Sequence, residues 1–189
     1  AMEHVSNGQN LLAAQKFNDA EIFYPQSVWA PKSALMSAYS YYSQNYYSDA
    51  IYEIDRYFKK YPNDKNLVYA HYLKGMCYFE QVEDEKKNFA SIDGAKKELE
   101  YIIKNYPNTD FALDSKYKLE LINSVLASKE IYLGRYYMQR KKWIASIKRF
   151  KYGLNNYDTT VYAHEALHRI VELYYILGYE EESKNYANI

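Results

Sequence analysis

The 189-residue sequence has one cysteine, Cys77, and therefore cannot form an internal disulfide. It lacks any run of about eighteen apolar residues, the minimum for a membrane-spanning helix. Its 24 basic and 24 acidic residues cancel, so it lacks the basic excess that suits nucleic acid or an anionic lipid surface. Glycine and proline are scarce, with 6 and 4 residues, which leaves long stretches without a helix breaker.

These long stretches carry apolar residues at intervals of three and four positions. Leu119, Ile122, Val125 and Leu126 illustrate the spacing, which gathers apolar side chains on one face of a helix. No segment shows the alternation expected of a half-buried strand. The sequence therefore predicts an all-α fold. Because residues 108–133 contain neither glycine nor proline, we expect one long helix from about residue 110 to about residue 141.

Three segments repeat nearly the same pattern: Tyr46–Asp64, Ser91–Asp110 and Lys142–Thr159. In each, a small residue follows an aromatic or apolar residue by three positions, and a turn comes twelve positions later; the small residues are Ala50, Ala95 and Ser146. A second small residue lies upstream of each, at Ala38, Gly75 and Gly134. Small side chains at these two places allow the two antiparallel helices of a hairpin to approach closely.

This pattern resembles the tetratricopeptide repeat, a helix–turn–helix unit of thirty-four residues. It predicts a right-handed α-solenoid of about five repeats that spans residues 1–189. Repeats one to three would occupy residues 1–107, and the long helix with repeats four and five would occupy residues 108–189. The fifth unit, around Leu173–Ala187 with Tyr179 in the aromatic position, is degenerate, as expected of a terminal capping repeat.

The first repeat is irregular. Gly8 lies twelve residues before Ala20, and Phe17 takes the aromatic position, but only five residues separate Ala20 from Pro25. Either the second helix of this repeat is shorter by about two turns, which would expose its neighbour, or residues are missing between Ala20 and Tyr24. We favour missing residues as the explanation.

Three segments are similar to the BamD-type outer-membrane-assembly lipoproteins. Tyr24–Pro62 resembles the second repeat of that family, and Leu126–Phe150 and Thr159–Tyr179 resemble its fourth and fifth repeats. The resemblance implies a non-enzymatic scaffold at the periplasmic face of the outer membrane, attached to the membrane only through a lipidated N-terminal cysteine. No cysteine precedes Met2, so we expect that anchor to lie outside this sequence.

The resemblance also implies the partners. They are a POTRA domain of a BamA-type β-barrel insertase, unfolded outer-membrane β-barrel proteins recognised by their C-terminal signals, and other lipoproteins of the assembly complex. We expect no nucleic acid and no cofactor. The alternative from the repeats alone is another tetratricopeptide adaptor of the cell envelope.

The first helix of each repeat lines the concave face of a tetratricopeptide solenoid, which makes its outward residues candidates for a peptide groove. In repeats two and three these candidates are Leu35, Tyr39, Tyr42, Ser43, Tyr69, Tyr72, Met76 and Phe79. Aromatic rings bury a large area with few rotatable bonds, which suits an extended chain ending in an aromatic residue. The 25 tyrosines could instead reflect a compositional bias. Half of the candidate side chains could also pack between repeats and not line a groove.

Basic residues in repeat four are candidates for the insertase interface. Arg149 matches the basic residue of an Asn-Arg stretch in the second helix of that repeat in the family, and a guanidinium can pair with a carboxylate through two hydrogen bonds. Arg135, Arg140 and Lys141 could extend the same surface. The alternative is that Arg149 is an ordinary solvated helix charge beside Lys148.

The segment His164–His168 reads HEALH and matches the zinc-binding motif H-E-x-x-H. A zinc hydrolase would need a third ligand further along the chain, and no second motif supplies one. We therefore expect no metal site and no enzyme activity, and keep the zinc hydrolase only as a remote alternative. Cys77 lies beside Met76 in a helical stretch and is expected to be a buried structural thiol.

Overall fold

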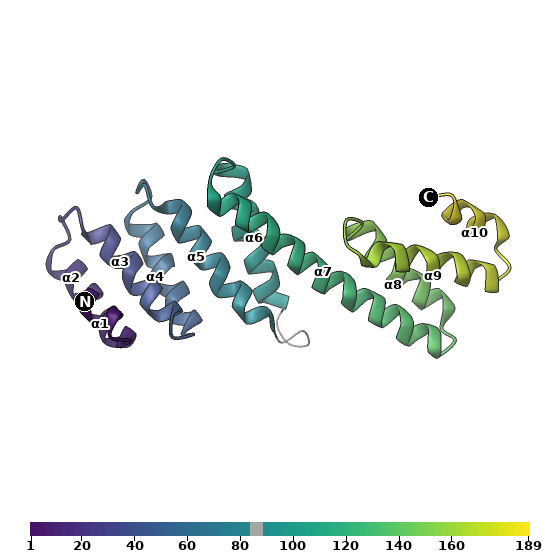
Figure 1. The fold of residues 1–189 in the computed structure, drawn as a ribbon, viewed down its shortest axis with the longest axis horizontal. Coiled ribbons are helices and arrows are strands. Elements are labelled where there is room, and N and C mark those ends of the chain that lie inside the picture. Colours follow the sequence, from purple (N-terminus) through teal and green to yellow (C-terminus); the bar gives the residue numbers. More distant parts are fainter. Residues whose placement is uncertain (84–88) are drawn as a thin grey trace. The chain divides into compact units, whose positions relative to one another are not determined.

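The computed structural model describes residues 1–83 and 89–189, and within these ranges all regular structure is helical (Figure 1). The elements are α1 (Met2–Ser6), α2 (Asn10–Phe23), α3 (Ala30–Tyr42), α4 (Tyr47–Lys60), α5 (Leu67–Phe79), the 3-10 helix η1 (Glu80–Glu83), α6 (Phe89–Asn105), α7 (Asp110–Gln139), α8 (Trp143–Asn156), α9 (Tyr162–Ile176) and α10 (Glu180–Ala187). The ten α-helices form five hairpins in chain order. The all-α fold and the tetratricopeptide-like pairing of helices are therefore confirmed.

The predicted long helix is confirmed as α7, which begins at Asp110 and ends at Gln139, two residues before the expected end. None of the helices in the described ranges combines the length and the apolar composition required to cross a membrane.

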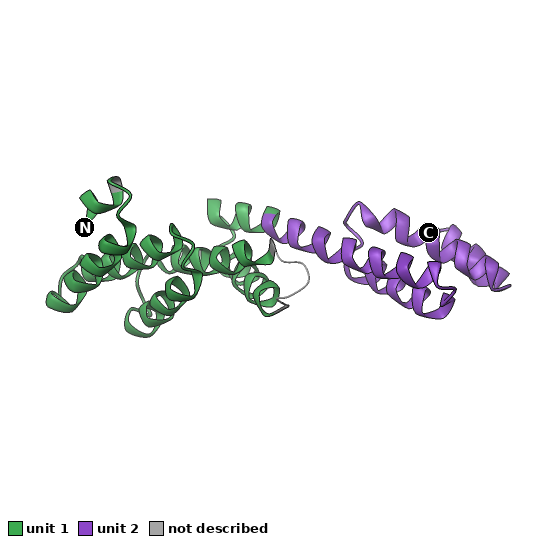
Figure 2. Cartoon of the chain, turned by 90° about the horizontal axis from the view of Figure 1, so that it is seen from below, with its two compact units in different colours: residues 1–117 green, residues 118–189 purple. Residues whose placement is uncertain are grey.

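The chain divides into two compact units, residues 1–117 and residues 118–189 (Figure 2). The boundary lies inside α7, whereas the division expected from the repeats, between residues 107 and 108, lies just before this helix. The first eight residues of α7 belong to the first unit, and the remainder belongs to the second.

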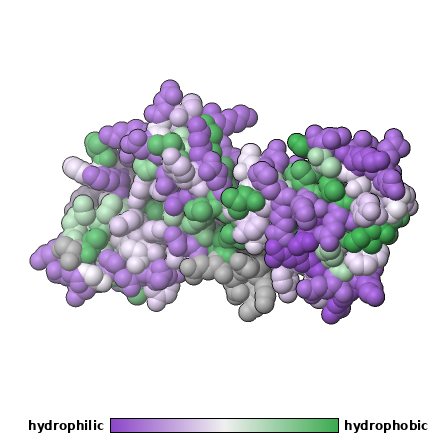
Figure 3. All heavy atoms as spheres, turned by 45° about the vertical axis from the view of Figure 1, so that its right-hand side comes forward, coloured by the Kyte–Doolittle hydropathy of each residue, from purple (hydrophilic) through white to green (hydrophobic). Residues whose placement is uncertain are grey.

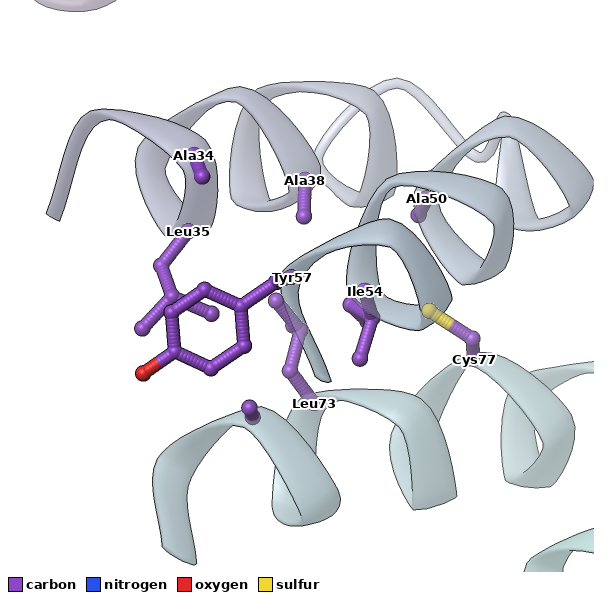
Figure 4. Packing of buried hydrophobic residues seen from close by; sticks show 9 residues of the cluster. Ala34, Leu35, Ala38, Ala50, Ile54, Tyr57, Leu73 and Cys77 are labelled. Atoms are coloured by element: carbon purple, nitrogen blue, oxygen red, sulfur yellow. The ribbon is translucent and has the colours of Figure 1, made fainter. Parts of the chain in front are cut away.

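The core of the first unit lies between α3, α4 and α5. Leu35 from α3, Ile54 and Tyr57 from α4, and Leu73 from α5 point toward one another in Figure 4, and none is more than 4% exposed. The small residues Ala38 and Ala50 are fully buried, as the repeat pattern requires. Close approach of α3 to α4 therefore depends on the absence of larger side chains at these two positions.

The second unit repeats this design between α7, α8 and α9. Ile131, Phe150 and Ile170 are buried together, and Gly134 lies directly against the Phe150 ring. Ser146 Oγ donates a hydrogen bond of 2.7 Å to the Gly134 carbonyl oxygen. The two small residues that the sequence pattern paired thus lie in contact across the α7–α8 hairpin.

The structure corrects the register of the first repeat. Helix α2 has 14 residues, the same length as α4 and α8, and it runs without interruption through Ala20 to Phe23. Ala13 is fully buried at the place that Ala50 takes in α4, and it lies twelve residues before Pro25. The expectation of missing residues is therefore wrong.

Ala20, the predicted packing residue of the first repeat, does not pack against the next helix as Ala50 does. Ala20 lies on a half-exposed side of α2, whereas Phe17 is a core residue at the place that Ile54 takes in α4. Gly8 is not a helix-packing residue either, because it lies in the turn between α1 and α2 with φ of 73°.

The fifth repeat is also shifted from its predicted register. Tyr179 is the N-cap of α10, one position before the aromatic slot, which Glu180 occupies. The buried small residue is Ser183, whose Oγ donates a 3.0 Å hydrogen bond to the Val171 carbonyl oxygen twelve positions upstream. This contact matches the one between Ser146 and Gly134, so the last hairpin keeps the helix–helix contact although its sequence pattern is weak.

Four hairpin turns share one backbone geometry. Gly8, Asn45, Lys141 and Gly178 all have positive φ, of 73°, 62°, 57° and 80°, and each lies two positions before the second helix of its hairpin. The following amide donates back to the last turn of the first helix, for example from Tyr46 to the Tyr41 carbonyl oxygen at 3.1 Å. This is a Schellman-type C-terminus, which favours glycine because left-handed backbone crowds a side chain.

Lys141 is the least suitable residue for this geometry. Replacing Lys141 with glycine is expected to raise the free energy of unfolding by about 0.5–1 kcal/mol, because the left-handed strain of a side chain disappears. The matched control is Lys141→Ala, which removes the same charge and most of the side chain but keeps a Cβ in the left-handed region. Urea unfolding of both variants checks this, and equal effects would show that strain at residue 141 is not the cause.

Candidate partner-binding surfaces

Aromatic side chains from the first helices of three successive hairpins form one surface in the first unit. We call it the aromatic patch; it consists of Tyr39 and Tyr42 on α3, Tyr69 and Tyr72 on α5, and Phe111 on α7. The ring centroids of Tyr39 and Tyr42 are 6.4 Å apart. The Phe111 ring lies 6.0 Å from Tyr69 and 5.0 Å from Tyr72.

The tyrosines of α3 and those of α5 in the aromatic patch lie close enough to influence one another's pKa. Burial raises the pKa of Tyr69 to about 12, and the neighbouring hydroxyls of Tyr39 and Tyr42 contribute to the rise. Burial also raises the pKa of Tyr42 to about 12 and raises that of Tyr72, whose hydroxyl donates a 2.6 Å hydrogen bond to Asp114. These phenols therefore stay neutral at physiological pH and offer ring faces together with hydroxyl groups.

The remaining groove candidates differ from the aromatic patch in how far their side chains are exposed. Leu35 and Met76 depart from the expectation, because they are only 4% and 7% exposed, and Leu35 belongs to the hydrophobic core. A residue that points into the core presents almost no area to a ligand. Ser43 is exposed at the end of α3, where its hydroxyl donates to the Ser40 carbonyl oxygen, and Phe79 is half-buried at the end of α5.

Sequence reasoning missed Phe111. It lies in the first turn of the long helix α7, twenty-three residues before Gly134, the small residue that fixes the register of the fourth repeat. The repeat pattern therefore contains no signal for Phe111, and its contacts with Tyr69 and Tyr72 place it in the patch.

The predicted basic residues are mostly engaged within the second unit. Arg149 Nη1 lies 3.2 Å from Glu130 Oε2, with 43% of the arginine side chain exposed. Arg135 donates two hydrogen bonds to the Glu165 carboxylate, at 2.7 and 2.5 Å. The Arg140 guanidinium lies 4.1 Å from the centre of the Tyr136 ring.

These basic residues border two different surface pockets. Arg149 lines a pocket of about 340 Å³ together with Tyr137, Lys148 and Tyr152. Arg135 lines another of about 400 Å³ that also includes Trp143 and Arg169. Lys141 is exposed in the α7–α8 turn. Arg149 and Arg135 thus each combine a partly exposed guanidinium with a neighbouring pocket and a second cation. They differ in that Arg135 is held by two hydrogen bonds to Glu165, whereas Arg149 makes one longer contact with Glu130.

A polar cluster on α4, α5 and α6 was not anticipated. The His71 ring stacks on Phe58 at 4.3 Å and contacts Tyr101 at 4.2 Å, beside an open pocket of about 780 Å³. Glu98 Oε2 lies 2.7 Å from His71 Nδ1, and Glu98 Oε1 lies 3.2 Å from Lys74 Nζ. Burial alone would raise the pKa of Glu98, but His71 and Lys74 outweigh it, so the pKa is lowered and the carboxylate stays charged.

The HEALH segment lies in α9 and takes part in the packing of the second unit. Its glutamate, Glu165, is held by Arg135, and Ala166 is fully buried in the core of the second unit. In residues 1–83 and 89–189 no group of three histidine, cysteine or acidic side chains is placed to hold a metal ion. Cys77 is fully buried, and burial raises the pKa of its thiol to about 12, as expected of a structural cysteine.

Comparison with known proteins identifies the family of the chain. A family model described as outer membrane lipoprotein, YfiO, matches residues 1–189. The chain belongs to the YfiO family of outer membrane lipoproteins. The family match covers both units, including the first repeat with its corrected register.

Three relatives of the family carry the same name, outer membrane protein assembly factor BamD. The protein from Caulobacter vibrioides is 38% identical over 172 residues, which cover 91% of this chain and 56% of the relative. The protein from Rickettsia prowazekii is 34% identical over 94% of this chain and 70% of its own length. The protein from Neisseria meningitidis is 27% identical over 93% of this chain and 69% of its own length. The chain thus spans little more than half of the first relative.

Proposed function

We propose that this chain is a non-enzymatic scaffold of the machinery that assembles β-barrel proteins in the outer membrane. Membership of the YfiO family and the names of the three relatives support this role. The fold fits it, since stacked helical hairpins present extended surfaces to partners. The zinc hydrolase alternative loses its support, because Glu165 is already bound by Arg135.

The aromatic patch is the observation that carries the second part of the proposal, recognition of unfolded β-barrel proteins. We infer that Tyr39, Tyr42, Tyr69, Tyr72 and Phe111 bind the C-terminal strand of such a client. Five rings from three helices offer a large apolar area at low entropic cost. The four tyrosine hydroxyls can form hydrogen bonds along an extended backbone, where that of Tyr72 can only accept because its proton is donated to Asp114.

A peptide-binding measurement tests this inference. The probe is a fluorescent peptide of about ten residues, the length of one membrane strand, that ends in phenylalanine. The double variant Tyr39→Ala/Tyr42→Ala is expected to weaken its affinity at least about tenfold, because aromatic anchors dominate such interfaces. Tyr52→Ala is the matched control, since Tyr52 is an exposed tyrosine of the second helix α4.

A peptide whose terminal phenylalanine is replaced by serine should bind the wild-type chain weakly. Equal affinity of both peptides, or equal loss from Tyr39→Ala/Tyr42→Ala and Tyr52→Ala, would refute the assignment of the aromatic patch.

We propose that the second unit binds a POTRA domain of a BamA-type insertase, with Arg149 at the interface. Reversing one charge would also disturb its partner Glu130, so the sharper variant is the exchange Arg149→Glu/Glu130→Arg, which keeps an ion pair inside the chain. Affinity for the POTRA domain nearest the barrel is expected to fall at least about tenfold, equivalent to about 1.4 kcal/mol. Isothermal titration calorimetry measures this affinity, and Lys16→Glu in the first unit is the charge control. An unchanged affinity of the exchanged variant would show that Arg149 is not at the interface.

The location follows from the same proposal. A lipidated cysteine ahead of α1 would tether the chain to the periplasmic face of the outer membrane, where other lipoproteins of the complex could join it. The family description supports this attachment, since it names outer membrane lipoproteins.

A further inference from the structure

The connection between α2 and α3 exposes an unusual amount of apolar surface. Five large side chains are between 62% and 93% exposed within eight residues: Ile22, Phe23, Tyr24, Val28 and Trp29. We call this group the apolar tip. Figure 3 shows groups of hydrophobic atoms, in green, between hydrophilic ones on the face that it draws. A contiguous exposed apolar group marks an interaction site more often than a scattered one does.

The other repeats show that the fold does not require this apolar surface. The amides of Tyr24, Tyr61, Tyr106 and Tyr157 make the same helix-ending hydrogen bond in the four inter-repeat connections, which fixes the alignment. The two positions before these tyrosines are Lys59 and Lys60 in α4, Lys104 and Asn105 in α6, and Asn155 and Asn156 in α8. Only α2 among these four places apolar side chains, Ile22 and Phe23, at the two exposed positions.

Composition and charge indicate what covers the apolar tip. The segment Ile22–Lys32 has no acidic residue and one lysine, in a chain that is one-quarter charged. Lys32 Nζ lies 5.3 Å from the centre of the Trp29 ring. Tryptophan and tyrosine prefer the boundary between lipid tails and headgroups, and a lysine beside them can reach up to the phosphates.

We propose that the apolar tip inserts into the interfacial layer of a phospholipid bilayer and gives the folded chain a direct membrane contact in addition to any lipid anchor. A family of outer membrane lipoproteins has a bilayer within reach. Two signals together, a lipid chain and an apolar protein surface, bind a membrane far more stably than either does alone. The contact would also fix which side of the first unit faces the membrane.

Vesicle binding of the chain tests this proposal. The probe is a sonicated vesicle of phosphatidylethanolamine with a minority of phosphatidylglycerol. Wild-type chain is expected to cosediment with it, and Phe23→Asn/Trp29→Asn should reduce the partition coefficient at least about tenfold. The control Val161→Asn/Tyr175→Asn removes two similarly exposed apolar side chains from the second unit and should change binding less than about twofold.

A fluorescence measurement locates the contact. In a Trp143→Phe background Trp29 is the remaining tryptophan, and its emission should shift to shorter wavelength and be quenched by lipids brominated in the upper acyl chain. Absence of vesicle binding, or equal binding by the Asn variant, overturns the proposal. Self-association of the wild type without lipid that the Phe23→Asn/Trp29→Asn variant abolishes would also overturn it, because a second copy would then cover the apolar tip.

Discussion

Gly134→Ala is expected to lower the free energy of unfolding by about 2 kcal/mol, although alanine is the better helix former. A methyl group on residue 134 would lie 2.5 Å from Phe150 Cε1 and 2.6 Å from Cζ. Phe150 is fully buried, so its ring has no free space to move into. Overpacking of about 3 kcal/mol therefore outweighs the gain of about 1 kcal/mol in helix propensity.

Gly153→Ala is the matched variant in the neighbouring helix. A methyl group there would meet only Glu130 Cβ at 3.5 Å, an ordinary contact. This substitution should raise the free energy of unfolding by about 0.5–1 kcal/mol through helix propensity. Urea unfolding followed by circular dichroism measures both changes, and stabilisation by Gly134→Ala would show that α7 and α8 can separate at little cost.

Arg56→Met is expected to lower the free energy of unfolding by about 3 kcal/mol, because it leaves a buried carboxylate without its main partner. Glu21 is 1% exposed and accepts hydrogen bonds from Arg56 at 2.6 Å, Lys60 at 2.8 Å and Tyr61 at 2.9 Å. Arg56 also pairs with the buried Glu53 at 2.8 Å. One guanidinium thus bridges carboxylates from two successive hairpins, and Lys60 supplies the second positive charge.

An exposed pair provides the comparison. Lys16 and Asp19 lie 3.5 Å apart on α2 with about half of each side chain exposed. Lys16→Met should change the free energy of unfolding by less than about 0.5 kcal/mol, because water screens this pair. Thermal unfolding of both variants at one pH distinguishes them. Similar losses from Arg56→Met and Lys16→Met would mean that water reaches Glu21 in the folded chain.

The same cluster explains how the first hairpin is held in place. Glu21 and Asn18 come from α2, whereas Arg56, Lys60 and Tyr61 belong to α4 and its end. Helix α1 has only five residues and covers little of α2. Charged hydrogen bonds between α2 and α4 therefore add to the apolar packing of α2, whose Ala13 and Phe17 are buried.

The proposed binding functions of the two units depend on different residues. In the first unit the aromatic patch lies on α3, α5 and α7, while the apolar tip lies at the connection from α2 to α3. In the second unit Arg149 lies on α8 beside its own pocket. Variants at these three places can be tested one at a time; because Tyr42 and Tyr69 also pack against the core of the first unit, circular dichroism of their variants checks that the fold is kept.

The sequence alone is sufficient to predict the helical fold, the number of hairpins, the start of α7 and its end to within two residues. These features depend on local rules: the spacing of apolar residues, the positions of proline and glycine, and small residues where two helices touch. The family could also be recognised from the sequence, because the repeats preserve their order and spacing. The positions of the tyrosines on first helices followed from the same count.

The surroundings of each of these side chains depend on tertiary packing. Ala13 and Ala20 are both alanines on α2, and only packing against the next hairpin shows that Ala13 is the buried one. Leu35 and Tyr39 lie one helical turn apart, yet one is in the core and the other is exposed. Phe111 joined the aromatic patch only through contacts with Tyr69 and Tyr72, about forty residues earlier in the chain. Local sequence rules specify where a helix begins and which periodicity it has, but burial depends on neighbours distant in the chain, and these are brought together only on folding.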